Sequence, residues 1–453
     1  MSRIPLLTLL LALVPYAAAQ QPLRVATFQV DVTPPLGAPL CCDGGVKAAE
    51  RIVDSLTARG LILTGAGKPI VLVAVDWEGI ANEGWDEWRK AIANAAATDA
   101  DRVTVNTLHQ HDAPGYDPRA DQLAGETGLG GKIFHREFSR EALKRTEAAV
   151  RAAAAKPLVV THLGLGKAKV EGVASNRRIL GDDGRIRFER MSSCRVPEVR
   201  DAPEGVIDPY VRTVSFWQRE RPLAAITYYA THPQSHYGQG GVSADFVGMA
   251  RTLRETALPG VAHIHFNGAG GNIAAGKYND GSPGMRPVLA RRLADGMAAA
   301  WSATVKVPIH AADVGWRVLP VALPPSAALR DQAELAAKMR NTELQQRLRL
   351  AAAHDLTWIK RYQEQRTIPL FLLTLGPAST LYMPGELFVE YQLAAQAVRP
   401  DAFVAMAAYG DYGPGYIGTR IAYSQGGYET GSVSRTAPEV EDVLLTGIRK
   451  LLQ

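Results

Sequence analysis

The chain has 453 residues, of which 47% are apolar and 21% are charged, with a formal net charge of +5 and 3 cysteines. This composition is too apolar for a disordered protein, and 3 cysteines are too few for a disulfide scaffold. The small positive charge is mixed with acidic residues along the chain, which argues against a nucleic-acid partner. We therefore expect a large globular protein. It should lack a transmembrane segment, since no stretch of the sequence approaches the roughly 20 consecutive apolar residues that a transmembrane helix needs.

The N-terminus predicts export of the protein. Arg3 is followed by the short apolar run 4–14 and by the small residues 17–19, which is the layout of a secretory signal peptide and its cleavage site. The run is too short to span a bilayer. We expect residues 1–19 to be removed and the mature chain, from Gln20, to be secreted or periplasmic.

The three cysteines leave two interpretations open. In an oxidising compartment, Cys41 or Cys42 could form a disulfide with Cys194. Alternatively, all three are small, buried side chains in their reduced form.

From residue 20 onward, short β-prone runs alternate with Ala-rich helical stretches, which is typical of an α/β fold. The expected strands lie at 24–30, 69–76, 102–107, 213–216, 223–229, 262–266, 369–374 and 402–407. The expected helices lie at 83–97, 137–155, 247–256, 286–303, 387–398 and 437–452. The segment 326–367 lacks strand patterning and predicts a helical insertion, either one long helix or a helical hairpin. We expect mixed β-sheets flanked by helices in a single domain, 20–453.

Two histidines follow the strand expected at 102–107. His109 and His111 are two residues apart, so on an extended segment both side chains point to the same side. An H-x-H pair at a strand end is a common way to present imidazoles to zinc, and the strand ends of an α/β sheet open into the crevice where ligands bind. Paired histidines also occur as ordinary polar loop residues. The spacing does not choose between His109 and His111 as a ligand.

A third candidate imidazole follows the strand expected at 223–229. Pro233 forces the preceding residue toward extended geometry, so His232 emerges at the strand end. There it is either a metal ligand or a surface loop histidine. The short motif Ser243-Ala-Asp245 follows it.

A second H-x-H pair, His263 and His265, lies inside the strand expected at 262–266 rather than at its end, which favours a structural role. The Gly-rich loop 267–272 after this strand lacks the lysine of a Walker motif. We predict that its backbone N–H groups bind an oxyanion or a polar substrate, with Asn272 as a substrate-binding residue.

Two further polar segments lie near the C-terminus. Glu386 follows Pro384 and Gly385, where it is either a functional carboxylate or a residue at a helix start that meets the positive end of the dipole. The segment 409–429 is dense in tyrosine and glycine, which suits a loop over a polar pocket better than a core segment. The substrate-binding residues predicted in this segment are Asp411, Arg420 and Tyr428.

Taken together, these motifs resemble the neutral/alkaline ceramidase superfamily, in particular its N-terminal catalytic domain. The matching segments, in the order of the family, are Asp31-Val-Thr-Pro-Pro-Leu-Gly37, His109-Gln-His111-Asp-Ala-Pro114, Asn176-Arg177, Thr231-His232-Pro233, Ser243-Ala-Asp245, Pro384-Gly385-Glu386 and Tyr423. They cover nearly the whole chain after the signal peptide.

The resemblance implies one catalytic Zn2+ per chain. Its implied ligands are His109, His232, Glu386 and Tyr423. The implied catalytic residues are His111, which would transfer a proton, Arg177, which would orient a polar or anionic part of the substrate, and Asp245.

The sequence departs from the family at Ala274. In the run Gly271-Asn272-Ile273-Ala274, this alanine stands where the ceramidases carry an active-site serine, so any role of that serine is absent or moved. The sequence also ends near Gln453, where neutral ceramidases continue into a β-sandwich domain. We expect one catalytic domain without that partner.

We therefore predict a secreted zinc-dependent hydrolase, an amidase that cleaves an N-acyl amide through a Zn-activated water. The expected substrate is a small-molecule or lipid amide, either ceramide-like or an amino-sugar amide. Two alternatives stay open: an esterase, lactonase or other hydrolase of the same fold, or a non-catalytic, zinc-stabilised ligand-binding protein. The oligomeric state is not predicted.

Overall fold

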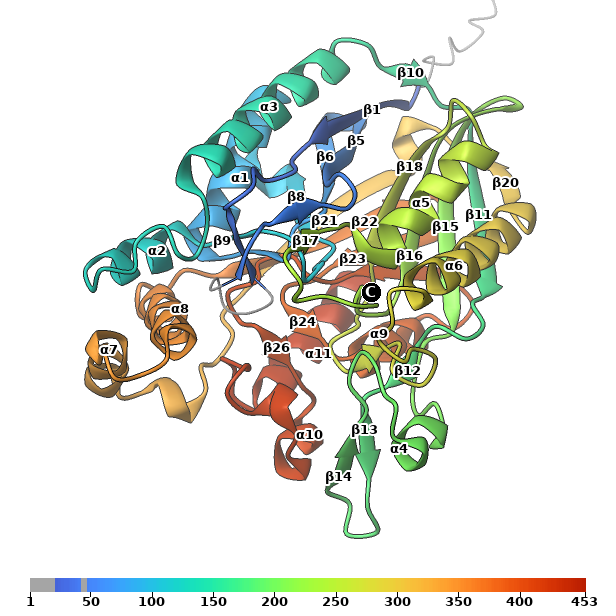
Figure 1. The fold of residues 1–453 in the computed structure, drawn as a ribbon. Helices are drawn as coiled ribbons and strands as arrows, with labels where there is room; N and C mark the ends of the chain where they lie inside the picture. The colour runs from blue at the N-terminus through green and yellow to red at the C-terminus, as the bar shows by residue number, and fades with distance from the viewer. Residues whose placement is uncertain (1–20, 42–46) are drawn as a thin grey trace, which may run out of the picture.

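The structure is a computed structural model that describes residues 21–41 and 47–453. The predicted signal peptide and Cys42 lie outside the described residues. Three main β-sheets are flanked by helices (Figure 1), which confirms the predicted mixed α/β fold. Within the two described ranges, no helix combines the length and the apolar character needed to cross a membrane.

The first sheet is built mainly from the N-terminal part of the chain. Its strands, in spatial order, are β10 (Leu158–Val159), β1 (Arg24–Asp31), β5 (Thr57–Gly65), β6 (Gly67–Val75) and β8 (Val103–Thr107). All neighbours are antiparallel except β6 and β8, which are parallel. Helices α1 (Asn82–Ala95) and α3 (Arg136–Ala154) pack against this sheet.

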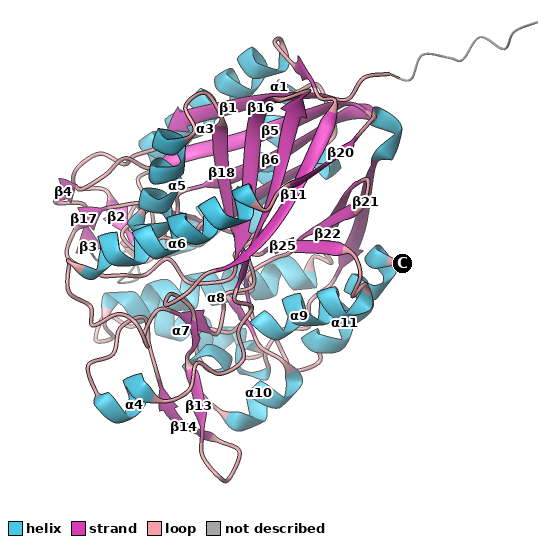
Figure 2. Ribbon diagram, turned by 90° about the vertical axis from the view of Figure 1, so that its right-hand side faces the viewer, coloured by secondary structure: helices cyan, strands magenta, loops and turns pink. Residues whose placement is uncertain are grey.

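The second sheet comes from the middle of the chain. Its strands, in spatial order, are β18 (Ala262–Asn267), β16 (Arg221–Tyr229), β15 (Tyr210–Gln218), β11 (His162–Lys169) and β20 (Val305–Pro308). Here too one pair is parallel, β16 with β18, and the other pairs are antiparallel. Helices α5 (Asp245–Ala257) and α6 (Met285–Ser302) cover the sheet (Figure 2).

The third sheet is C-terminal. Its strands, in spatial order, are β21 (Val314–Val321), β22 (Ile368–Leu375), β23 (Ala378–Tyr382) and β25 (Phe403–Ala407). Again the last pair, β23 with β25, is parallel. Helices α9 (Val389–Val398) and α11 (Val440–Leu452) pack on it.

Short elements connect the sheets. The short strands are β2 (Pro39–Leu40), β3 (Lys47–Ala48), β4 (Arg51–Ile52), β7 (Gly79–Ile80), β9 (Gly115–Tyr116), β12 (Ser175–Asn176), β13 (Arg178–Leu180), β14 (Ile186–Glu189), β17 (Gly241–Val242), β19 (Ile273–Ala274), β24 (Glu386–Leu387) and β26 (Tyr416–Ile417). The remaining helices are α2 (Pro118–Gly125), α4 (Pro197–Asp201), α7 (Gln332–Arg340), α8 (Gln346–Gln363), α10 (Arg420–Gln425) and the 3-10 turns η2 (Ala100–Arg102), η3 (Ala311–Asp313), η4 (Ala327–Leu329) and η5 (Tyr428–Thr430).

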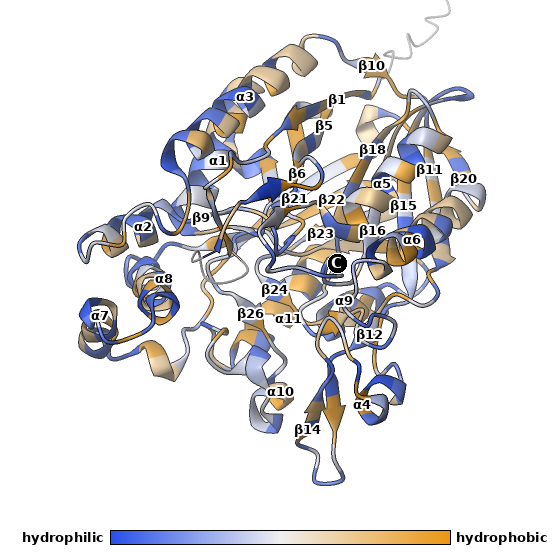
Figure 3. Ribbon diagram, in the orientation of Figure 1, coloured by the Kyte–Doolittle hydropathy of each residue, from blue (hydrophilic) through white to orange (hydrophobic). Residues whose placement is uncertain are grey.

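The apolar patterns of the sequence explain how the sheets and helices pack. In β6 every residue from Ile70 to Val75 is buried, as expected for a strand paired in parallel and covered on both faces. Helix α3 buries Phe138, Ala142 and Val150 at helical spacing, so one stripe faces the sheet and the other is polar. Figure 3 shows this mixture along α3.

Among the strands that were not predicted, β5 and β11 have apolar runs that are interrupted by glycine and by a charged residue. In β5, a Cβ on Gly60 would lie 2.3 Å from the ring of Phe28, so only glycine leaves room for that ring. In β11, a Cβ on Gly166 would lie 1.9 Å from the carbonyl oxygen of Ala300 in α6. Close packing, rather than strand propensity, selects glycine in both strands.

The predicted helical insertion takes the form of a hairpin. Between β21 and β22, the segment 326–367 contains the helices α7 and α8, which pack against each other. Helix α8 also packs against α2 and α1 of the first sheet. The insertion therefore extends from the third sheet to the elements around the first.

The loops that follow the three parallel strand pairs meet at the centre of the molecule. Thr107 N donates to Tyr409 O (2.8 Å), and Ala408 N donates to Asn267 O (3.0 Å). Asn267 Nδ2 also donates to Leu108 O (2.6 Å). These bonds join the ends of β8, β18 and β25, one strand from each sheet. The polar motifs that follow these strands in the sequence therefore lie together in space.

Cys194 is a free cysteine whose Sγ lies 3.6 Å from the carbonyl oxygen of Val196. The disulfide considered between Cys41 and Cys194 is therefore not formed.

Candidate metal centre

His109 leaves the end of β8 in a left-handed backbone conformation, with φ of 62°. Its backbone N donates to Trp77 O (2.9 Å), and its side-chain Nδ1 lies 2.8 Å from Glu78 O. Because a carbonyl oxygen only accepts, Nδ1 carries the proton, and the lone pair of the ring is on Nε2. The buried Nε2 has no hydrogen-bond partner in the described structure.

His232 follows β16 and is oriented in the same way. Its Nδ1 lies 2.5 Å from Gly270 O and 3.1 Å from Ile273 O, so this ring also carries its proton on Nδ1. The Gly-rich loop was predicted to present N–H groups to a substrate. Instead, it presents a carbonyl oxygen to His232, while the N–H of Gly271 donates to Leu387 O.

Glu386 joins the two imidazoles from the third sheet. Its Oε2 lies 2.8 Å from His232 Nε2 and 3.1 Å from His109 Nε2. Gly385, with φ of 60°, makes the turn that brings Glu386 in from β23. Gly271 approaches the Glu386 backbone so closely that a Cβ there would lie 2.2 Å from Glu386 O.

The donor set of this group fits a bound cation. The ligand atoms of His109, His232 and Glu386 lie within 4.8 Å of one another, and all three residues are buried. Two imidazole lone pairs and a carboxylate oxygen converge. All three atoms are hydrogen-bond acceptors, and none of them carries a proton to donate to the others. Such an arrangement is stable only with a positive charge among the three atoms, and two His and one Glu are ligands that catalytic zinc uses.

The ionisation of these side chains agrees with this interpretation. Burial opposes the charge on Glu386, but His109 and His232 outweigh it and hold the pKa of Glu386 well below its usual value. Burial also opposes the charge on His109, yet Glu386 raises the pKa of His109 above its usual value. Burial and the nearby Arg177 lower the pKa of His232 to about 3. The carboxylate is thus ionised, and the site favours a positive charge beside it.

Arg177 lies beside this group, as predicted for a substrate-orienting residue. Its buried guanidinium donates to the hydroxyls of Tyr416 (2.9 Å) and Tyr428, and to Gln234 Oε1 (2.7 Å). Tyr428, a predicted substrate-binding residue, is therefore in the same polar cluster. Tyr416 OH also lies 3.2 Å from His232 Nε2, which connects the cluster to the metal ligands.

His111 lies on the other side of His109. The two ring centroids are 4.7 Å apart, and His111 Nδ1 lies 3.1 Å from the backbone oxygen of His109. Burial and the neighbouring imidazoles lower the pKa of His111 well below its usual value, so the ring is neutral. A neutral imidazole next to the ligand group can accept a proton, which is the role predicted for it.

The structure does not bring Tyr423 or Arg420 to this group. The hydroxyl of Tyr423, in α10, lies 2.8 Å from Thr436 Oγ1. Arg420 is at the start of the same helix and forms a surface ion pair with Asp442. Tyr412 and Tyr416 contact the ligands instead, and Tyr416 does so because β24 and β26 pair in a register that sets it opposite Glu386.

The other three predicted site residues hold the backbone of the site. Asp245 accepts from the backbone N of Ser235 (3.1 Å), in the loop that follows His232. Asn272 accepts from Val389 N (2.9 Å), and its own carbonyl accepts from Arg177 N (2.8 Å).

The Asp411 side chain contacts backbone N–H groups and an arginine of the insertion. It accepts from Asn82 N (2.8 Å) and Gly413 N (2.9 Å), and its Oδ2 lies 3.3 Å from Arg361 of α8. Its backbone oxygen accepts from Gly385 N (3.0 Å), next to Glu386. Asp411 therefore positions the loop that carries the carboxylate ligand.

Ala274, the residue at the position of the family's serine, is fully buried in β19. It pairs with Ser175 in β12, and the hydroxyl of Ser175 donates to its carbonyl oxygen (2.8 Å).

The sequence did not identify the residues that hydrogen-bond to the ligands, or to the loop that carries them, and so orient them. Tyr412 donates to Glu386 Oε1 (2.8 Å), and Glu78 supplies the carbonyl that orients His109. Gln110 lies between the two histidines in sequence, and its Nε2 donates to Asp76 Oδ1 (3.0 Å). Asp76 in turn pairs with Arg251 of α5 (2.6 Å). Of these residues, Asp76 and Glu78 could have been recognised in the sequence, because polar residues directly after an apolar strand are candidates for a site at the strand end.

Sequence and structure comparisons give different results. No protein-family model matches the sequence, and no curated protein matches it. In contrast, neutral ceramidase from Pseudomonas aeruginosa superposes with a TM-score of 0.68 and 16% identity, over 95% of this chain and 74% of that chain. A ceramidase complexed with C2 superposes with a TM-score of 0.68 and 16% identity, over 95% of this chain and 75% of that chain. The chain therefore has a neutral-ceramidase-like fold, in agreement with the resemblance of its motifs.

Proposed function

We propose that this protein is a zinc-dependent hydrolase of amide bonds. The observation that carries the proposal is the buried convergence of His109 Nε2, His232 Nε2 and Glu386 Oε2 within 4.8 Å. The fold adds support, because the similar structures are ceramidases and ceramide is an N-acyl amide. The predicted signal peptide makes secretion or a periplasmic location part of the proposal.

Zinc bound by these three residues would lower the pKa of a water to about 7 and polarise a carbonyl oxygen. The chain's own residues supply the remaining functions. The neutral ring of His111 would take up a proton and return it to the leaving amine. The guanidinium of Arg177, with the hydroxyl of Tyr416, would donate hydrogen bonds to a polar group of the substrate and orient it.

The proposal is tested by metal analysis together with turnover. We expect one zinc per chain, and hydrolysis of at least one member of a panel of N-acyl amides that stops when a chelator is added. His109→Ala and Glu386→Gln should lose both the zinc and the activity. His310→Ala removes an exposed imidazole and serves as the matched control that keeps both.

Two results would contradict the proposal. Full activity in a metal-free protein would exclude a metal-dependent mechanism. Stoichiometric iron in place of zinc would point to the oxygen chemistry for which two histidines and one carboxylate also serve as ligands. Including matched esters and lactones in the panel shows which bond is cleaved, and zinc binding without any turnover would favour a ligand-binding protein.

A further inference from the structure

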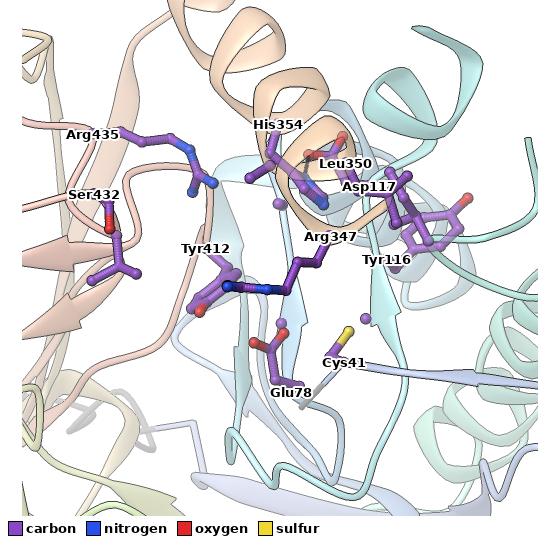
Figure 4. A pocket seen from close by; sticks show the side chains of 16 residues that line it. Cys41, Glu78, Tyr116, Asp117, Arg347, Leu350, His354, Tyr412, Ser432 and Arg435 are labelled. Atoms are coloured by element: carbon purple, nitrogen blue, oxygen red, sulfur yellow. Dashed lines mark hydrogen bonds and ion pairs between the residues drawn. The ribbon is translucent and has the colours of Figure 1, made fainter. Parts of the chain in front are cut away.

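A cavity of about 210 Å³ is lined in part by Glu78 and Tyr412, two residues that contact candidate metal ligands (Figure 4). Helix α8 of the insertion forms one wall, the start of α2 another, and the segment 432–435 a third. The volume is below the roughly 300–1,000 Å³ of most ligand pockets. It therefore suits one small portion of a substrate rather than a lipid with two long chains.

The cavity and the candidate metal centre share two residues. Tyr412 lines the cavity and donates from its hydroxyl to Glu386 Oε1 (2.8 Å). Glu78 lines the cavity with its side chain, and its carbonyl accepts from His109 Nδ1 (2.8 Å). A group held in the cavity is consequently next to the residues that orient two of the three ligands.

The charged side chains of the cavity fall into two kinds. Asp117 pairs with His354 (3.0 Å), and Arg435 pairs with Asp355 (2.8 Å), so these charges are already balanced. The carboxylate of Glu78 and the guanidinium of Arg347 form no ion pair with any residue in the described ranges. In Figure 4, Arg347 extends from α8 across the cavity, over Glu78 and beside Tyr412.

We propose that this cavity binds the amine side of the substrate and that this portion carries a carboxylate. The carboxylate would pair with Arg347, since a guanidinium presents a planar set of donors that matches it. The amide N–H, or the ammonium formed after cleavage, would face the carboxylate of Glu78. The substrate class is thus an N-acylated amino acid. That the bound molecule is a substrate rests on the proposed function, whereas its binding in the cavity does not require turnover.

The test measures binding with a ligand that the protein cannot hydrolyse. N-(alkylsulfonyl)glycine has a sulfonamide in place of the scissile amide, and its glycinamide counterpart differs only in lacking the carboxylate. We expect the zinc-loaded protein to bind the carboxylate form about tenfold more tightly by titration calorimetry. In Arg347→Gln this preference should disappear, while Arg347→Lys should retain part of it.

Arg340→Gln removes an exposed arginine of the same insertion that does not line the cavity, and should leave the preference unchanged. Equal binding of the two ligands by the wild-type protein would overturn the inference, as would an equal preference in Arg347→Gln and the wild type. A clear carboxylate preference without turnover of any amide would support this site and count against the proposed hydrolase, so the two failures are distinguishable.

Discussion

The proton positions of two imidazoles decide what the site can bind. Backbone carbonyls of Glu78 and Gly270 accept from the Nδ1 atoms of His109 and His232, which leaves both Nε2 lone pairs directed at Glu386. Carbonyl acceptors of this kind orient ligand histidines and raise their basicity. The ligand geometry is therefore present in the chain before a metal binds.

The identity of the tyrosine at the site is testable by a pair of single substitutions. Tyr416→Phe removes a hydroxyl that lies 3.2 Å from His232 Nε2 and 2.9 Å from Arg177. We expect a loss of about 10–100-fold in zinc affinity or in kcat/KM. Tyr423→Phe removes a hydroxyl that, among the described residues, hydrogen-bonds to Ser434 and Thr436 rather than to the ligands, and should change neither. The reverse ranking, measured by zinc titration and steady-state kinetics, would restore Tyr423 as the ligand.

At the level of elements, each sheet contributes one ligand from the same kind of position. His109 follows β8, and His232 follows β16, each a member of a parallel pair. Glu386 follows β23, a member of the third such pair. The ends of parallel strands are where an α/β sheet opens a crevice. Here three such ends face one another, which encloses the site.

A buried ion pair supports the loop that follows β8 and carries His109. Asp76, at the end of β6, accepts from Arg251 and from Gln110, the residue between the two histidines. Asp76→Asn breaks the pair and leaves the arginine buried without a counter-charge. We expect a loss of about 3–5 kcal/mol of stability in denaturant unfolding, together with weaker zinc binding.

The matched control for this variant is an exposed pair in the same sheet region. Lys68 and Asp99 lie 2.8 Å apart with more than half of each side chain exposed, so Asp99→Asn should cost about 1 kcal/mol or less. An Asp76→Asn protein as stable as Asp99→Asn would show that the buried pair does not hold the loop.

For the whole molecule, a metal at this site would connect all three sheets. A ligand that binds only the folded state stabilises it by about 4 kcal/mol at a free concentration of 1,000 times its Kd. We expect a chelator to lower the Tm by at least about 4 °C in calorimetry, and His109→Ala to show no such response. An equal Tm with and without the chelator in the wild type would mean that no tight metal site exists.

The pH dependence of stability has a contribution from Asp411. Burial raises the pKa of Asp411 to about 6, although Arg361 opposes the shift. The folded protein therefore holds this proton more tightly than the unfolded chain, whose pKa is about 4. Protonated Asp411 therefore contributes roughly 3 kcal/mol to the free energy of unfolding at low pH. This contribution is lost as the pH rises from about 4 to about 6.

Asp411→Asn checks this sign. The amide keeps the acceptor for Asn82 N and Gly413 N but does not titrate. Relative to the wild type, the variant should therefore become more stable between pH 4 and pH 6 in denaturant unfolding. A difference in stability that stays constant over that range would show that Asp411 is already ionised at pH 4.

The sequence by itself predicted the α/β class, most core strands and the three residues of the candidate metal group. Apolar runs ending in polar residues mark the strand ends in β8 and β16, so local pattern gave His109, His111 and His232 as candidate ligands without choosing among them. The resemblance to a family's motif order then selected His109, His232 and Glu386. These signals are local, because a strand needs only its own apolar residues and its own polar end to be recognised.

Only the tertiary structure decided which polar residues meet. Tyr416 rather than Tyr423 reaches the ligands because β26 pairs with β24, and no local pattern encodes that pairing. The carbonyls of Glu78 and Gly270, which set the proton on each imidazole, are backbone atoms without a residue signature. The cavity beside Tyr412 also exists only because α8 of the insertion packs against the first sheet's elements. Contacts between distant segments depend on packing and register, and these are properties of the folded chain as a whole.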